Sequence, residues 1–192
     1  MHTTASAIVD DVIVELPAAP ARPMVNAALA AVVTEFLDRT HAALAELDAI
    51  DIVAEVYLYT LALPDEYRGY RIGKPAAVVL SGEELRAGID YRMASRTSLQ
   101  LRDMPQEDAT GALEVTATLA LDDIHEADLS PLEEWYAAIA SGVKFKMMAM
   151  PRRPWTDQQS AAYYRTEYFD GLSRAMLSAV TDGNGKPQRL SV

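Results

Sequence analysis

Apolar residues at helical spacing open the chain and predict two helices. Between Ala5 and Leu16 they recur every three to four residues, which indicates a short helix with one buried face. Pro17 cannot continue that helix, because it lacks a backbone N–H and its ring clashes with the preceding turn. A second stripe keeps nearly a heptad step and predicts a long helix from Pro23 to Leu47. The residues of this stripe are Val25, Leu29, Val32, Phe36, Ala43 and Leu47.

Beyond the second helix, the apolar pattern changes to a period of two, which is typical of strands. Residues 52–59 alternate and are rich in β-branched and aromatic side chains, so they predict one strand. The short apolar run 76–80 predicts a buried strand, and 89–93 and 97–102 predict two more. The clearest alternation is 112–121, which predicts a strand with one buried face. The positions on that face are Leu113, Val115, Ala117, Leu119 and Leu121.

Two capping patterns place the last helices. Ser130-Pro131-Leu132-Glu133 combines a capping hydroxyl, a first-turn proline and a glutamate at the third helical position, so it predicts a helix start at Ser130. Pro151 and Pro154 interrupt this helix. A second capping box begins at Thr156 and predicts another helix start. That helix is expected to carry an apolar stripe with a second set of residues beside it. The stripe is Ala162, Phe169, Leu172, Met176 and Val180, and the flanking set is Ala161, Tyr164, Tyr168, Ala175 and Ala179.

These elements predict an α+β fold, with helices at both ends of the chain and strands between them. We expect an antiparallel helical bundle formed by residues 1–49 and 125–182. A mostly antiparallel β module, residues 50–124, is inserted into it. Glycine, asparagine and proline after the last helix predict a flexible tail over 183–192.

Charge is distributed unevenly along the 192 residues, whose net charge is −11. Residues 1–143 carry −15, whereas residues 144–192 carry +4. The acidic balance argues against a protein that clamps nucleic acid, because binding to phosphates requires clustered Lys and Arg. The chain has no cysteine, so a disulfide framework is excluded. No run approaches the roughly 18 apolar residues of a membrane span, and we expect neither a signal peptide nor a membrane partner.

The sequence offers few groups for catalysis. No glycine-rich phosphate loop or nucleophile elbow occurs. Asp122, Asp123, His125 and Glu126 gather side chains that bind metals, but this segment contains a single histidine and is interpreted as a solvated acidic loop. We therefore predict no catalytic residue, no cofactor and no resident metal, and we do not expect an enzyme.

The residues leave two alternative functions open. One is a small acidic metal-assisted hydrolase that uses Asp122, Asp123, His125 and Glu126. The other is a host-side protein-binding module, in which the C-terminal helices form a groove for a peptide.

The segment between the last two helices is the most distinctive feature of the chain. In Met150-Pro151-Arg152-Arg153-Pro154-Trp155, two prolines hold a short basic link in a restricted geometry. The arginines are interpreted either as a solvated helix connection or as a contact with another subunit or DNA.

The C-terminal sequence resembles the signature of tailed-bacteriophage head-to-tail adaptor proteins, also called connector or neck proteins. The resemblance is carried by Trp135 to Val143, Met147 to Pro151, Arg153 to Asp157, Ala161 to Arg165 and Phe169 to Ala175. The N-terminal segments Ile8 to Val12, Leu16-Pro17 and Phe36 to Thr40 are also similar to the opening of that family. The segment between them matches only in placement.

The resemblance implies a structural virion protein of the neck, between capsid and tail, that is assembled in the host cytoplasm. The expected partners are the portal protein, a tail or nozzle/stopper protein, and further copies of the chain in a ring, commonly of twelve. Double-stranded DNA would pass through the ring without specific binding. The residues that we expect to contact a neighbouring subunit or the portal are Trp135, Arg152, Arg153, Trp155, Tyr164 and Tyr168.

Overall fold

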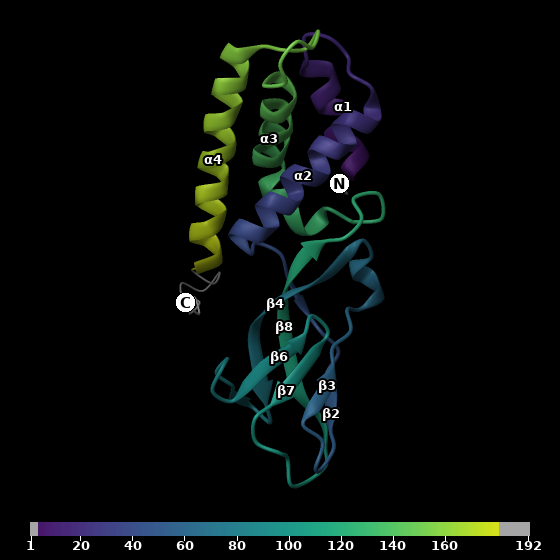
Figure 1. Ribbon diagram of the computed structural model, residues 1–192, viewed down its shortest axis with the longest axis vertical. Helices are drawn as coiled ribbons and strands as arrows, with labels where there is room; N and C mark the ends of the chain where they lie inside the picture. The colour runs from purple at the N-terminus through teal and green to yellow at the C-terminus, as the bar shows by residue number, and fades with distance from the viewer. Residues whose placement is uncertain (1–3, 181–192) are drawn as a thin grey trace. The chain divides into compact units, whose positions relative to one another are not determined.

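The computed structural model describes residues 4–180 and has a mixed α+β fold with antiparallel sheets (Figure 1). The described residues fall into two compact units. The helical unit comprises residues 4–43, 68–70 and 121–180, and the β unit comprises residues 44–67 and 71–120. The predicted tail at 183–192 lies outside the described residues.

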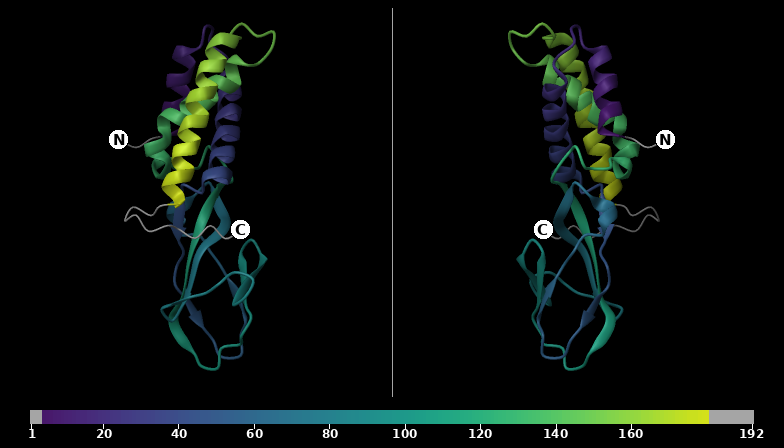
Figure 2. Two further views of the ribbon diagram at one scale, coloured as in Figure 1. Left: turned by 90° about the vertical axis from the view of Figure 1, so that its left-hand side faces the viewer. Right: turned by 90° about the vertical axis from the view of Figure 1, so that its right-hand side faces the viewer.

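Four α-helices form the helical unit, and α3 packs against each of the others. Their bounds are α1 Ala5–Glu15, α2 Arg22–Thr40, α3 Tyr136–Met148 and α4 Gln158–Val180. Figure 2 shows α4 running alongside α3, which is the most extensive helix contact. The first helix agrees with the prediction, because Ile8, Val9 and Val12 are buried at helical spacing.

The second helix is shorter than the sequence pattern predicted. It ends at Thr40, whose hydroxyl donates a hydrogen bond to the carbonyl of Phe36. His41 then adopts a left-handed conformation (φ 52°) and closes the helix by donating its N–H to Leu37. Residues 43–47 instead form extended chain with alternating burial, so Ala43 and Leu47 do not belong to the helix.

The predicted capping box at Ser130 is not formed. Residues Ser130–Trp135 make a 3₁₀ segment, η2, and α3 begins only at Tyr136. The N–H and the hydroxyl of Ser130 both donate to the Asp128 carboxylate, so this serine hydroxyl does not cap a helix. An aspartate two residues earlier thus competes with the helix for Ser130.

The start of α4 differs from the prediction by one residue, and its buried face combines Leu172 of the predicted stripe with residues of the predicted flank. Asp157, not Thr156, is the cap: its carboxylate accepts the backbone N–H of Ser160 at 3.1 Å. Ala162 and Met176 are exposed. The face that packs into the unit consists of Ala161, Tyr168, Leu172 and Ala175.

The β unit contains a five-stranded and a three-stranded sheet. In the first, β8 (Ala109–Leu121) pairs with β1 (Leu44–Glu46), β2 (Ile50–Ile52) and β4 (Tyr70–Leu80), and β4 pairs with β5 (Glu83–Glu84). In the second, β7 (Ser98–Leu101) lies between β3 (Leu58–Thr60) and β6 (Tyr91–Ser95). A short 3₁₀ segment, η1 (Asp65–Tyr67), follows β3. A shared apolar core includes residues from both sheets.

The single strand predicted over 52–59 is wrong, because the chain passes from one sheet to the other within it. Glu55 has a positive φ of 62°, and a turn joins the N–H of Val56 to the carbonyl of Val53. The turn is held from outside by Pro105, whose carbonyl accepts the N–H of Glu55, and by the Asp108 carboxylate, which accepts that of Ala54.

Strand β8 confirms the clearest sequence pattern. Its five predicted apolar positions are buried, as expected for one face against a core. Thr118, on the other face, is buried as well. Its hydroxyl accepts the N–H of Lys74 at 2.8 Å, beside Gly73, where a Cβ atom would lie 2.5 Å from that hydroxyl oxygen. The close approach of β4 and β8 therefore explains why residue 73 is a glycine and why Thr118 is buried.

We predict that Gly171→Ala destabilises the helical unit. Alanine normally stabilises a helix by about 1 kcal/mol relative to glycine, but a Cβ at 171 would overlap the Cβ of Ala138 on α3. We expect a net loss of about 1–2 kcal/mol, measured by urea unfolding. The double variant Ala138→Gly/Gly171→Ala removes the overlap and should recover part of the loss. Equal or higher stability of Gly171→Ala would contradict this packing.

Candidate functional site

The candidate site is the hinge between α3 and α4, residues 149–157. Its backbone is fixed by hydrogen bonds at both ends. Thr156 accepts the N–H of Arg153 at 3.0 Å and donates its hydroxyl to the carbonyl of Met150. The N–H of Asp157 donates to the carbonyl of Met148 at 3.1 Å. The threonine that was expected to cap α4 therefore closes the hinge instead.

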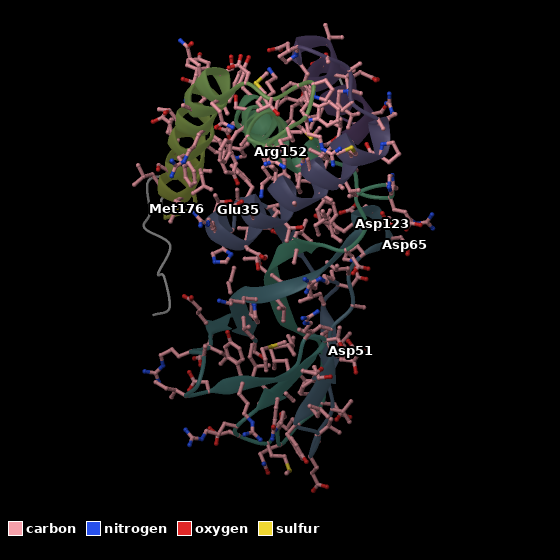
Figure 3. All side chains as sticks on the ribbon, turned by 45° about the horizontal axis from the view of Figure 1, so that its top comes forward. Glu35, Asp51, Asp65, Asp123, Arg152 and Met176 are labelled. Carbon is pink, nitrogen blue, oxygen red and sulfur yellow. The ribbon has the colours of Figure 1, made fainter. Side chains whose placement is uncertain are left out.

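The two arginines of the hinge are exposed to solvent. Arg152 has a positive φ of 58° and is labelled in Figure 3. A left-handed conformation is unfavourable for a residue with a Cβ, so the surrounding hydrogen bonds must hold it. No ion pair involves Arg152 or Arg153 within residues 4–180. Their charges therefore remain accessible to a partner.

Trp155 is buried, in contrast to the two exposed arginines, and it anchors the hinge by packing into the unit. Its side chain is buried, and its indole nitrogen has no hydrogen-bond partner among the described residues. Burial of a tryptophan ring contributes several kcal/mol of packing free energy, which exceeds the cost of one unpaired N–H. The hinge thus carries one apolar anchor and two exposed charges.

Trp135 and Tyr168 lie within the helical unit. The ring of the half-buried Trp135 is 6.1 Å from that of Phe36 on α2. Tyr168 is 1% exposed, and its hydroxyl has no partner in the part of the chain that the structure describes. Burial, and secondarily the nearby Glu35 carboxylate, raise the pKa of Tyr168 well above its usual range. The phenol therefore stays neutral at physiological pH.

Tyr164 belongs to a polar cluster that joins α1, α3 and α4. Lys144, in the middle of α3, lies 2.7 Å from the Glu15 carboxylate and 5.0 Å from the centre of the Tyr164 ring. The Tyr164 hydroxyl donates to the same carboxylate at 3.2 Å. Burial, together with this hydrogen bond to Glu15, raises the pKa of Tyr164.

A second polar contact joins α1 to α3. The Tyr136 hydroxyl donates to Asp11, and burial followed by this contact raises the pKa of Tyr136 to about 12. The polar side of α1 is thus tied to the unit at two places along its length. The sequence pattern missed this role, although a lysine in the middle of the apolar α3 segment was a usable signal for Lys144.

The six predicted contact residues therefore occupy different environments. Arg152 and Arg153 are exposed together on the hinge, whereas Trp155 and Tyr168 are buried and Trp135 and Tyr164 are half-buried. A direct contact of Trp155 or Tyr168 with a partner would require the side chain to leave the unit. Contact of the six residues with a partner stays a prediction.

The acidic segment at 122–126 forms a hydrogen-bonded turn. The Asp123 carboxylate accepts the N–H of His125 at 2.8 Å, and the Asp123 carbonyl accepts that of Ala127. Gly69 packs against this turn with a φ of 77°, and its carbonyl accepts the N–H of Asp122. Across residues 4–180, no three His, Asp or Glu side chains are grouped as a metal site would require.

No helix within residues 4–180 is both long enough and apolar enough to cross a membrane. Comparison of the chain with models of protein families and with curated proteins gave no match.

We predict that Tyr168→Phe is neutral or stabilising. The Tyr168 hydroxyl is buried and has no partner among residues 4–180, so its removal relieves a desolvation cost and the free energy of unfolding should rise by up to about 1 kcal/mol. Tyr164→Phe is the matched variant on the same helix, and it should lose about 0.5–1 kcal/mol because it gives up the hydrogen bond to Glu15. Chemical denaturation measures both. A loss above about 1 kcal/mol in Tyr168→Phe would show that its hydroxyl has a partner.

A second prediction concerns the Glu15 cluster. Glu15→Gln leaves the Lys144 side chain, which is only 10% exposed, without its counter-charge, and we expect a loss of about 1–2 kcal/mol. Asp10→Asn is the control on the same helix, because it removes the ion pair between Asp10 and Arg22, whose side chains are about half exposed. The control should cost less. Equal losses in thermal or urea unfolding would refute a special role for Lys144.

Proposed function

We propose that this chain is the head-to-tail adaptor of a tailed bacteriophage. In this proposal, it forms a ring, commonly of twelve copies, between the portal of the capsid and the tail. The observation that carries the proposal is the hinge at 149–157. The residues on both sides of Arg152 resemble the adaptor signature, and they build a fixed helix connection that exposes Arg152 and Arg153. The structural role of the ring requires a rigid surface of this kind rather than a catalytic pocket.

The proposal also specifies the architecture. The helical unit would be an antiparallel bundle, and the β unit would be the module inserted into it. Support comes from the order of the chain, because residues 44–67 and 71–120 lie in sequence between α2 and α3. It also comes from the contacts of α3 with all three other α-helices.

The charge of the chain is compatible with a channel for DNA. A net charge of −11 disfavours tight binding of phosphates, so double-stranded DNA would pass without being held. The basic hinge would then face protein. We assign Arg152 and Arg153 to the contact with the portal, and we place a tail or nozzle/stopper protein on the far side of the ring. The location would be the neck of the virion, assembled in the host cytoplasm.

Reversal of the hinge charges tests this proposal. Purified wild-type protein should co-sediment with the cognate portal ring, and electron microscopy should show an added ring of density. Arg152→Glu/Arg153→Glu should weaken binding by about tenfold or more, because it removes two complementary charges and introduces two repulsive ones.

The control reverses two other arginines of the same unit, Arg165 and Arg174, both exposed on α4. This variant has the same net charge as the hinge variant but keeps the hinge intact, so it should bind the portal like the wild type. Absence of any binding or added density with the wild type would overturn the adaptor proposal. Equal weakening by both variants would overturn the assignment of the hinge.

A further inference from the structure

The three-stranded sheet of the β unit carries a hollow of about 350 Å³. Strands β6 and β7 and the loop before β6 form it, and its lining includes Ile89, Tyr91, Arg92, Gln100, Leu101 and Arg102. Tyr91 and Leu101 are buried and give it an apolar floor, whereas Ile89 at its rim is 49% exposed. The hollow therefore offers apolar surface beside cationic groups.

The two arginines of the hollow are oriented by hydrogen bonds, and neither forms an ion pair within residues 4–180. Arg92 donates from Nε to the Gln100 side chain at 2.8 Å, which leaves its terminal nitrogens available. Arg102 donates to the carbonyl of Ile89 at 3.3 Å. Asp90 is 3.2 Å from Arg86, and its charge also interacts with that of Arg102 without an ion pair being formed between them. Asp90 is shared with Arg86, so positive charge remains at the hollow, and positioned guanidinium groups favour an acidic ligand.

The same unit carries a surface with the opposite charge. Residues 44–57, which we call the acidic edge, contain Glu46, Asp48, Asp51 and Glu55 and no basic residue. All four carboxylate residues are exposed, and Figure 3 labels Asp51 on this edge. Strands β1 and β2 each pair only with β8 in the described part of the chain, so their outer sides carry no strand. Val53 is 49% exposed beside them.

From these two surfaces, we propose that the arginine-lined hollow of one copy binds the acidic edge of a second copy of this chain. Charge complementarity supports this occupant. The segment 86–102 around the hollow has four arginines and one acid, and the acidic edge has four acids and no base. Each surface also offers an exposed aliphatic side chain, Ile89 on one and Val53 on the other, which the contact can bury.

The two surfaces are different parts of one chain, so the contact is heterologous. After one such contact, one copy keeps a free edge and the other keeps a free hollow for further neighbours, and repetition gives a closed ring or an open filament. This inference rests on the proposed function, which requires a ring, and it adds the pair of faces through which the copies meet. It assigns self-association to the β unit and leaves the hinge free for the portal.

The chain has no cysteine, which permits a specific cross-linking test. Full-length Ile89→Cys and Val53→Cys proteins are mixed under mild oxidation, and disulfide-linked dimers are resolved by mass. We expect the mixed dimer to form about tenfold faster than in a mixture of Ile89→Cys with Val14→Cys, whose site on α1 is 83% exposed but lies outside both faces. Equal rates in the two mixtures would overturn the inference.

Charge-reversal variants provide a second test of the same contact. Adding Arg92→Glu/Arg102→Glu to the Ile89→Cys protein should return the mixed rate to the background. When this charge-reversed protein is mixed with a Val53→Cys protein that also carries Glu46→Lys/Asp48→Lys, the fast rate of cross-linking should return. A rate that does not respond to either reversal would also overturn the inference. Portal binding is measured separately with the wild type, so a failed cross-link with intact portal binding rejects these faces and leaves the adaptor proposal standing.

Discussion

The close packing of α3 against α4 is the constraint on which the helical unit depends. Two glycines permit it: a Cβ at Gly142 would lie 2.8 Å from both the Tyr168 ring and a methyl of Val32, and one at Gly171 would overlap Ala138. Antiparallel helices that pack side by side can be joined by a short connection. The hinge is such a connection: the Thr156 hydrogen bonds and the left-handed Arg152 fix its backbone, and its two arginines are exposed.

Polar contacts, in addition to apolar packing, determine the position of α1 in the helical unit. The short helix α1 has 11 residues, which is too short for stability in isolation, so its position depends on tertiary contacts. Burial of its apolar face holds α1 on the helical unit. Asp11 and Glu15 on its polar side fix its register through Tyr136 and Lys144. We expect the pair of Lys144 and Glu15 to contribute more to the choice of a single arrangement than to net stability. The helical unit thus combines apolar burial with specific polar ties.

Much of the fold could be predicted where one face of an element decides its pattern, as in α1 and β8. The end of α2 was missed because Ala43 and Leu47 fit both a heptad step and strand alternation, and the helix end depends on His41 in a left-handed conformation. The break within 52–59 depends on Pro105 and Asp108, about fifty residues away, so no local pattern reveals it. At the candidate site, the sequence identified the exposed arginines but also grouped with them Trp155 and Tyr168, whose burial only the packed structure reveals.

The central claim is that a rigid hinge between α3 and α4 presents Arg152 and Arg153 to the portal. Hydrogen–deuterium exchange of the wild-type protein, alone and mixed with its portal ring, tests it most directly. The account predicts that portal binding slows exchange in peptides covering 148–157, while peptides from the acidic edge at 44–57 respond to self-association rather than to the portal. Binding that leaves exchange at 148–157 unchanged and protects another surface would contradict the claim.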